Sequence, residues 1–203
     1  MVTPDQLSID RQSDVLLWNA LIQDDQHAFA ELYQRYHRIL YSYGYKVIPN
    51  AASVEDAIQD LFVDIWRMRH SLSLVDSVKF YLFRSLRRKI FHLNEREKRT
   101  DSAIAFSTET EFAQSSEQLM ADREQEAQLT QRLAQLVAQL PQRQLEVVTL
   151  RFYQNFKTDE IAAIMGITEK SVRNTLHKAL THLREQAAYL APLLGFLLFW
   201  VLT

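Results

Sequence analysis

The chain has no cysteine among its 203 residues, and only three glycines and four prolines. The lack of cysteine excludes disulfide frameworks and thiolate metal sites, and it fits a reducing compartment. So few glycines and prolines leave few positions for tight turns, which favours a nearly all-helical protein. No apolar segment at the amino terminus resembles a secretion signal. We therefore expect an all-α, cytoplasmic protein of one large or two small domains.

Common catalytic motifs are also missing. The sequence has no glycine-rich phosphate loop, no Gly-x-Ser-x-Gly elbow and no His-Glu-x-x-His helix. His177 and His182 are five residues apart, a spacing that does not bring two imidazoles onto one helical face for a metal. We therefore expect no enzymatic activity, no metal site and no cofactor.

The net charge is only -2, but the charge is segregated along the chain. Residues 1–78 carry a net charge of -5, residues 79–99 carry +6, residues 100–126 carry -6 and residues 127–186 carry +3. Two basic stretches are thus separated by an acidic one. This pattern is typical of a protein with two nucleic-acid contacts, joined by a linker that avoids or imitates the polyanion.

The most informative stretch is residues 157–184, whose pattern predicts two helices joined by a one-glycine turn. Thr158 and Thr168 stand where a side chain can cap a following helix, and Gly166 has no Cβ to oppose a left-handed turn. Apolar residues at helical spacing predict the buried stripe of the second helix: Val172, Leu176, Ala179, Leu180 and Leu183.

The opposite face of this second helix predicts a DNA-reading surface. Its side chains can donate hydrogen bonds to base edges and phosphates in a major groove. They are Lys170, Ser171, Arg173, Asn174, His177 and Lys178. An ordinary helical hairpin with a solvated polar face is the alternative interpretation of the same spacing.

Residues 14–99 show helical periodicity in three parts. Residues 14–42 predict a pair of helices with a break at 23–26, and residues 53–69 predict a helix that Ser53 caps. The expected core stripe of that helix is Val54, Ala57, Ile58, Leu61, Phe62 and Ile65. A third helix is expected at residues 76–97, with Leu82 and Leu86 inside and basic residues largely outside.

The rest of the chain predicts a linker, a second domain and a tail. Residues 100–128 are rich in Ser, Thr, Gln and Glu and too poor in apolar residues for a core, as in a flexible acidic linker. Residues 129–186 regain helical periodicity and predict a four-helix module, with Pro141 in the first turn of its second helix. Residues 187–203 form a hydrophobic tail.

Three motifs in this order resemble those of the extracytoplasmic-function (ECF) class of bacterial RNA polymerase sigma factors. Residues 29–36 have the sequence FAELYQRY, residues 55–66 have EDAIQDLFVDIW, and residues 140–153 have LPQRQLEVVTLRFY. The second motif resembles the family's polymerase-binding helix, and the third is similar to the entry into its final helix-turn-helix. The resemblance covers roughly residues 14–186.

The resemblance implies a role for each segment. Residues 14–99 would dock on core RNA polymerase and recognise and melt the minus-10 promoter element, and residues 129–186 would bind the minus-35 element. The implied polymerase-binding residues are Gln59, Asp60, Asp64 and Trp66. The implied minus-10 residues are Lys79, Tyr81, Arg84, Arg87, Arg88 and Lys89, with Phe80, Phe83 and Phe91 interleaved as candidate stacking surfaces.

Trp66 and most of these aromatic residues have plain core packing as an alternative. By position, residues 69–77 match the family's loop that receives a flipped base.

The tail departs from the family pattern. Residues 187–202 include no charged side chain, but a helix of this length spans only about 24 Å against a hydrocarbon core of about 30 Å. Three interpretations stay open: membrane-interface association when the protein is idle, packing on this protein or on an inhibitory anti-sigma partner, and a tail anchor.

A different class of protein also fits part of the pattern. A helix-turn-helix regulator that binds DNA without joining polymerase would use residues 157–184 in the same way. It would have no need for the surface from Gln59 to Trp66, so binding to core polymerase separates the two hypotheses.

Overall fold

The computed structural model describes residues 4–100 and 133–188, and the surroundings of side chains at residues 13–93 and 133–186. All regular elements in these ranges are helical, which confirms the expected all-α fold. Most of the expected linker at residues 100–128 and of the tail at residues 187–203 lies outside the described residues. The chain divides into two compact units.

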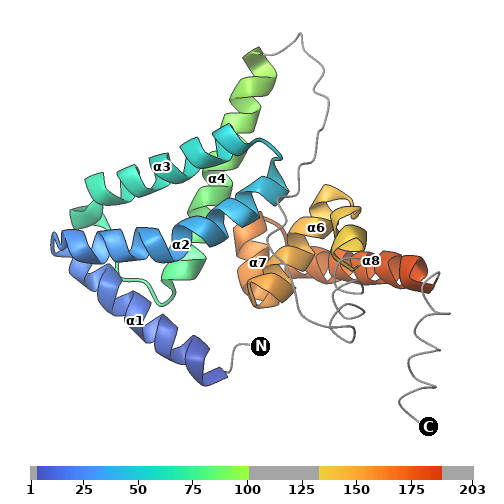
Figure 1. Cartoon of the computed structure of the whole chain (residues 1–203), viewed down its shortest axis with the longest axis horizontal. Coiled ribbons are helices and arrows are strands. Elements are labelled where there is room, and N and C mark those ends of the chain that lie inside the picture. The colour runs from blue at the N-terminus through green and yellow to red at the C-terminus, as the bar shows by residue number, and fades with distance from the viewer. Residues whose placement is uncertain (1–3, 101–132, 189–203) are drawn as a thin grey trace, which may run out of the picture. The chain divides into compact units, whose positions relative to one another are not determined.

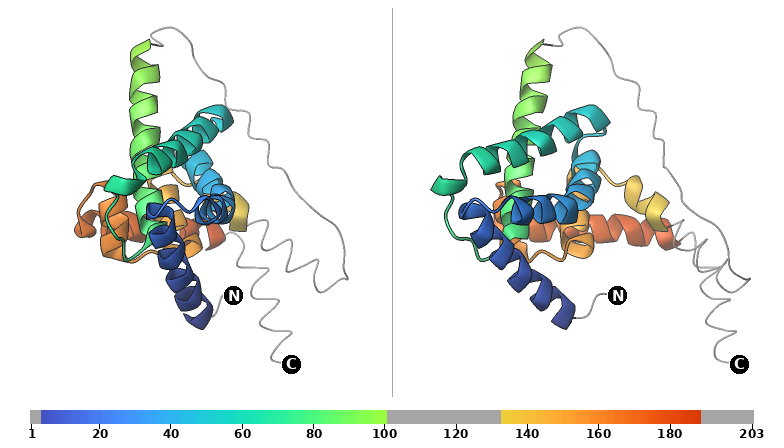
Figure 2. Two further views of the ribbon diagram at one scale, coloured as in Figure 1. Left: turned by 90° about the vertical axis from the view of Figure 1, so that its left-hand side faces the viewer. Right: turned by 60° about the vertical axis from the view of Figure 1, so that its left-hand side comes forward.

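The amino-terminal unit is a bundle of four helices (Figure 1). They are α1 (Pro4–Ile22), α2 (Gln26–Val47), α3 (Ala51–Arg67) and α4 (Val78–Thr100), with one 3-10 turn, η1 (Arg69–Ser71), after α3. Helix α2 packs against the other three, and α4 crosses both α2 and α3, as Figure 2 also shows. Trp18, Tyr43 and Phe83 are the largest fully buried side chains of this core.

Capping side chains determine where α2 and α3 begin. Asp25 caps α2, because its Oδ1 accepts hydrogen bonds from the backbone N–H groups of His27 and Ala28 at 2.8 and 3.1 Å. This confirms the predicted break at residues 23–26. The prediction that Ser53 caps α3 was wrong: Asn50 is the cap and accepts from the Ser53 N–H at 3.1 Å. Asparagine caps as well as serine, and the alanines at 51 and 52 extend the helix toward it.

The packing of α3 agrees with its periodicity. All six residues of its predicted stripe are buried. Gly44 of α2 lies against this stripe, where an added Cβ would come within 2.7 Å of Val54 Cγ1. Glycine is therefore required at this position by the close approach of α2 and α3.

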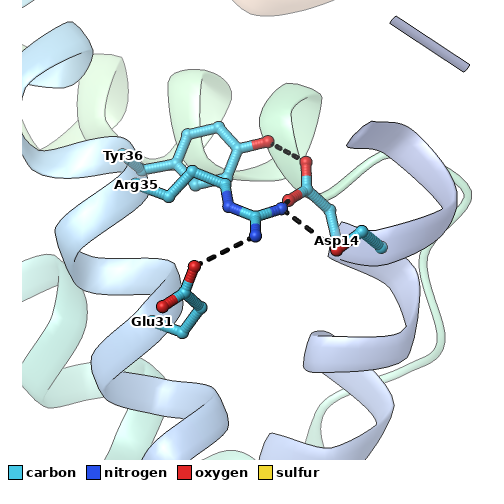
Figure 3. Close-up of polar contacts among 5 residues, drawn as sticks. Asp14, Glu31, Arg35 and Tyr36 are labelled. Atoms are coloured by element: carbon cyan, nitrogen blue, oxygen red, sulfur yellow. Dashed lines mark hydrogen bonds and ion pairs between the residues drawn. The ribbon is translucent and has the colours of Figure 1, made fainter. Parts of the chain in front are cut away.

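A buried carboxylate joins α1 to α2 (Figure 3). Asp14 is only 5% exposed; its Oδ1 lies 2.6 Å from Arg35 Nη1, and its Oδ2 accepts a hydrogen bond from the Tyr36 hydroxyl. Arg35 Nη2 also lies 3.1 Å from Glu31 Oε1. Burial opposes the charged guanidinium, but the hydrogen bonds and charges of Glu31 and Asp14 outweigh it and raise the pKa of Arg35. The carboxylate is thus compensated where α1 meets α2.

The carboxy-terminal unit has the expected four helices. They are residues 133–138, α6 (Gln142–Val148), α7 (Thr158–Met165) and α8 (Glu169–Ala188), with a π-helical turn, η2 (Thr149–Tyr153), after α6. Pro141 lies just before α6 and not inside its first turn as predicted. One core cluster of the unit consists of Val137, Leu140, Val148 and Ala179, against which Leu145, Leu176 and Leu183 pack.

The turn between α7 and α8 has the predicted geometry. Gly166 has a φ of +65°, and a Cβ there would meet nothing within 4 Å, so the left-handed backbone alone calls for glycine. Thr168 caps α8 by accepting from the Ser171 N–H at 3.2 Å, as expected. Thr158, however, begins α7 instead of capping it: the Lys157 N–H donates to Glu160 Oε2 at 2.7 Å, which closes the first turn.

One prediction of burial was wrong. Leu180 was expected in the stripe of α8 but is 42% exposed, because it lies 100° around the helix from the buried Ala179. Phe83 is fully buried in the amino-terminal core, which agrees with the core-packing alternative for the aromatic residues of α4 and leaves this ring unavailable for stacking. Among the described residues, no helix has the length and apolar character needed to cross a membrane.

Candidate nucleic-acid and polymerase interfaces

The polar face of α8 is open to solvent. Five of its six predicted DNA-binding residues are exposed: Lys170, Arg173, Asn174, His177 and Lys178. Ser171 is half-buried, and its backbone N–H donates to the capping Thr168 Oγ1. Arg173 Nη1 lies 3.0 Å from Glu169 Oε2, one turn earlier. Such an exposed pair is worth only about 0.3–0.5 kcal/mol, so it holds Arg173 weakly.

The basic face of α4 is far less open. Of the six residues predicted there, Arg88 is exposed, while Lys79, Tyr81, Arg84, Arg87 and Lys89 are half-buried. Lys89 Nζ lies 2.5 Å from Asp64 Oδ2 of α3, and Arg87 Cζ lies 4.3 Å from the centre of the Phe91 ring. Several of these cations therefore have partners within the protein.

The aromatic residues of α4 divide into core and surface. Tyr81 is half-buried and its ring lies 4.9 Å from that of Trp18. Phe80 is half-buried with Arg84 Cζ 5.9 Å from its ring centre, and Phe91 is exposed. Phe91 is therefore the most exposed of these rings, and parts of Phe80 and Tyr81 also reach the surface.

The outer face of α3 carries the predicted polymerase-binding residues. Gln59 and Asp60 are exposed, and Asp64 is half-buried in its pair with Lys89. Val63, 49% exposed, lies on the same face, one turn from Gln59 and Asp60. Val63 is not among the four polymerase-binding residues that the resemblance implies.

Trp66 packs against its own protein more than Gln59, Asp60 and Asp64 do. Its ring lies 5.1 Å from that of Phe29 in α2, and Arg69 Cζ lies 4.4 Å above it. It is half-buried, so one part of the indole packs inward and another part reaches the surface. Core packing and partner binding are both available to this residue.

Residues 68–77 form the connecting loop between α3 and α4. Its backbone is tied to α1, because the indole Nε1 of Trp18 donates to the Ser73 carbonyl at 3.1 Å. Arg69 forms an ion pair with Asp24 in the α1–α2 turn. Leu74 is 76% exposed. The contacts of Trp18 and Asp24 with this loop were not predicted from the sequence, since the partners are 55 and 45 residues away along the chain.

No group of side chains suited to hold a metal ion occurs in the part of the chain that the structure describes. The faces of α4 and α8 consist mainly of hydrogen-bond donors, cations and a few rings, whereas the outer face of α3 carries carboxylates, an amide and a valine.

Comparison with known families accounts for both units. Residues 32–100 match the family described as sigma-70 region 2, and residues 130–183 match sigma-70 region 4, together more than half of the chain. The chain belongs to the sigma-70 family, in its ECF class. It is a sigma factor, which binds core RNA polymerase, recognises promoter DNA and directs transcription initiation; a regulator that never joins polymerase is not favoured. Sigma factors are initiation factors and are not known as enzymes.

Curated relatives agree with this assignment. The ECF sigma factor SigL of Mycobacterium tuberculosis is 27% identical over 156 residues, which cover 75% of this chain and 85% of SigL. The ECF sigma factor RpoE of Cereibacter sphaeroides is 26% identical over 183 residues, which cover 86% of this chain and 97% of RpoE.

Two solved structures have the same fold. CnrH, determined with the cytosolic domain of CnrY, superposes with a TM-score of 0.57 at 21% identity, covering 87% of this chain and 97% of CnrH. The sigma factor RpoE of Bartonella quintana, determined with the anti-sigma factor NepR, gives a TM-score of 0.57 at 20% identity, with 77% of this chain and 94% of RpoE covered.

Proposed function

We propose that the two units of this sigma factor divide its task. Residues 14–99 dock on core polymerase and recognise and melt the minus-10 element, residues 100–128 link the units, and residues 129–186 bind the minus-35 element. The two separate family matches, one in each unit, support this division. The exposed polar face of α8 is the observation that carries the DNA-binding part.

Docking on polymerase uses the outer face of α3. Asp60, Gln59 and Asp64 supply hydrogen-bond acceptors and negative charge, which suit a basic coiled coil of the polymerase clamp. Val63 adds an apolar contact, and the exposed part of Trp66 extends the surface toward the connecting loop. Central aromatic and apolar residues ringed by polar ones are typical of binding hot spots.

Binding at the minus-10 element uses α4 and the connecting loop. Lys79, Arg84, Arg87, Arg88 and Lys89 neutralise phosphates, with Tyr81 beside them. The connecting loop receives an unstacked base. Unstacking costs a few kcal/mol, so the loop has to provide compensating contacts.

Binding at the minus-35 element uses α8 in the major groove. Arg173, Lys170 and Asn174 contact base edges, and Lys178, with Ser171 and His177, contacts the phosphate backbone. All six residues lie within nine positions, between the cap at Thr168 and the middle of α8. Its amino-terminal half is therefore the part that enters the groove, as in helix-turn-helix proteins.

The protein acts in the cytoplasm, where its polymerase and promoters are. We further propose an inhibitory anti-sigma partner, because two structurally similar sigma factors were determined with protein partners, one of them named as an anti-sigma factor. The tail at residues 187–203 is a control element that is retained by that partner or by a membrane when the protein is idle.

Run-off transcription tests the proposal as a whole. Purified full-length protein is added to core polymerase lacking any sigma factor, with a library of genomic promoter fragments as template. Discrete transcripts whose start sites share two spaced sequence elements are the expected result. Tight DNA binding without any transcript in the presence of core polymerase would contradict it.

A further inference from the structure

The connecting loop is fixed at both its start and its end. Its first turn is closed by hydrogen bonds from the Ser71 N–H and Oγ to the Met68 carbonyl, both 2.8 Å long. At its end, Ser77 Oγ accepts from the Phe80 N–H at 3.2 Å and so caps α4. These bonds are local, and they leave the middle of the loop to be positioned by other parts of the molecule.

One anchor outside the loop is the α1–α2 turn, which holds the first turn of the loop. Asp24 forms an ion pair with Arg69 Nε, and its Oδ1 lies 3.3 Å from His70 Nε2. Arg69 Nη1 also donates to the Trp66 carbonyl at 2.7 Å while its guanidinium covers the Trp66 ring. The carboxylate of Asp24 therefore holds η1 against the end of α3.

The backbone of Asp24 is itself unusual. Its φ of 70° lies in the left-handed region, which only glycine, asparagine and aspartate enter at modest cost. Of these three residues, aspartate alone provides a negative charge, and that charge faces Arg69 and His70. The turn thus combines a conformational requirement with an ionic one.

The other anchor is Trp18 of α1. Its side chain is fully buried, and its indole N–H reaches the Ser73 carbonyl, 55 residues further along the chain. Figure 1 shows the connection from α3 to α4 passing beside α1, and α1 contacts η1. Because Ser73 directly precedes Leu74, this bond fixes the place where the 76% exposed leucine leaves the protein surface.

We propose that Trp18 and Asp24 are positioning residues for the connecting loop and set its shape before DNA arrives. Both precede residues 32–100, where the region 2 match lies. A loop ordered in advance does not lose its freedom on binding, so more of the contact energy remains for holding an unstacked base. The inference rests on the proposed minus-10 function of this loop.

The test compares two neighbouring aspartates in the full-length protein bound to core polymerase. Asp24→Asn keeps the size and left-handed tolerance of the residue but removes the charge that holds Arg69. Asp25→Asn removes the same charge one position later, and asparagine caps α2 as well as aspartate does. The two variants therefore have equal net charge, and they differ in whether the substituted side chain contacts the connecting loop.

The first measurement is promoter opening, followed with 2-aminopurine placed in the minus-10 element. Since exposed ion pairs contribute up to about 1 kcal/mol, we expect Asp24→Asn to slow opening roughly three- to fivefold, with core-polymerase affinity unchanged. Asp25→Asn should behave as wild type.

Trp18→Phe provides a second, independent variant. It keeps a ring against Tyr81 and removes the N–H that bonds Ser73. A phenylalanine in this buried site also lowers stability, so thermal unfolding is measured alongside. The decisive readout is base preference on fork-junction DNAs that vary each minus-10 position, because lost stability alone scales all four bases equally. We expect Asp24→Asn and Trp18→Phe both to reduce the difference in affinity between DNAs with preferred and with disfavoured minus-10 bases.

Leu74→Ala separates failure of this inference from failure of the proposed function. If Leu74→Ala impairs opening while Asp24→Asn and Trp18→Phe open promoters with wild-type rate and base preference, the positioning role is overturned. If Leu74→Ala and both anchor variants all match wild type, the connecting loop does not serve the minus-10 element at all. Equal slowing by Asp24→Asn and Asp25→Asn would also overturn the inference, since net charge would then explain the effect.

Discussion

The two predicted DNA-binding faces of this protein differ in how they hold their cations. On α8, five of the six predicted residues are exposed, and Arg173 has only a weak pair with Glu169. On α4, five of the six are half-buried, and Lys89 is paired with Asp64 of a neighbouring helix. A face of the first kind binds duplex DNA with little rearrangement, whereas a face of the second kind has to exchange internal partners for phosphates.

This contrast suits two different substrates. A minus-35 reader meets an intact double helix, whose shape is known in advance. A minus-10 reader meets DNA that changes from paired to melted, and contacts that form only with the melted strand favour melting. The exchange of Asp64 for a phosphate is one way to make a contact conditional on the DNA.

The largest effect is expected at the polymerase-docking face. Replacing Asp60 and Trp66 together with alanine should abolish core binding, because central aromatic and charged residues each contribute 2 kcal/mol or more, about 30-fold in affinity. Co-purification with core polymerase measures the loss. Asp60→Ala alone is the control for packing, since Asp60 is exposed whereas Trp66 contacts Phe29. A double variant that binds core enzyme with unchanged affinity would show that docking occurs elsewhere.

The second-largest effect is expected on DNA binding by the exposed face of α8. Arg173→Ala should cost about 1–3 kcal/mol at one promoter position, because a bidentate contact to a base edge is lost. Lys178→Ala should weaken specific and scrambled duplexes alike and lower the salt slope by about one unit. Titration of both duplexes at several salt concentrations distinguishes these outcomes. Equal losses on the two duplexes for Arg173→Ala would reject its base-reading role.

A smaller effect on DNA affinity is expected from breaking the ion pair between Lys89 of α4 and Asp64 of α3. Asp64→Asn frees Lys89, so the affinity of the holoenzyme for minus-10 DNA should rise by less than 1 kcal/mol, or at most about fivefold. Because Lys89 already exchanges Asp64 for a phosphate in the wild type, the salt slope of Asp64→Asn should change little. The double variant Asp64→Asn, Lys89→Gln is the control; it should lose the gain in affinity and lower the salt slope by about 0.9, the value for one phosphate contact. A salt slope that the double variant leaves unchanged would mean that Lys89 does not contact phosphate.

The smallest effect on transcription is expected from the tail. Deleting residues 187–203 should leave promoter-directed transcription by purified holoenzyme intact, because the α8 face lies in the preceding turns. The same deletion should improve solubility and weaken retention by a membrane or partner in cells, as fractionation would show. A truncated protein that is unfolded, or soluble but inactive, would place the tail in the core of the carboxy-terminal unit.

The sequence by itself predicted the features that depend on local order. Six residues at helical spacing identified the buried face of α3, and a lone glycine followed by the capping Thr168 identified the turn before α8. Such features follow from the 3.6-residue period and from backbone conformation, which neighbouring residues determine. The exposed face of α8 was predictable for the same reason.

Only the tertiary structure decided which helices meet and at what angle. Leu180 and Phe83 are both apolar, yet Leu180 is exposed and Phe83 is buried. Their burial depends on how much of each helix surface is covered by the helices that pack against it. The pairs Asp24–Arg69, Trp18–Ser73 and Lys89–Asp64 join residues 45, 55 and 25 positions apart. No periodicity within a helix specifies such pairs, because they form only where the crossing of α1, α3 and α4 brings two side chains within hydrogen-bonding distance.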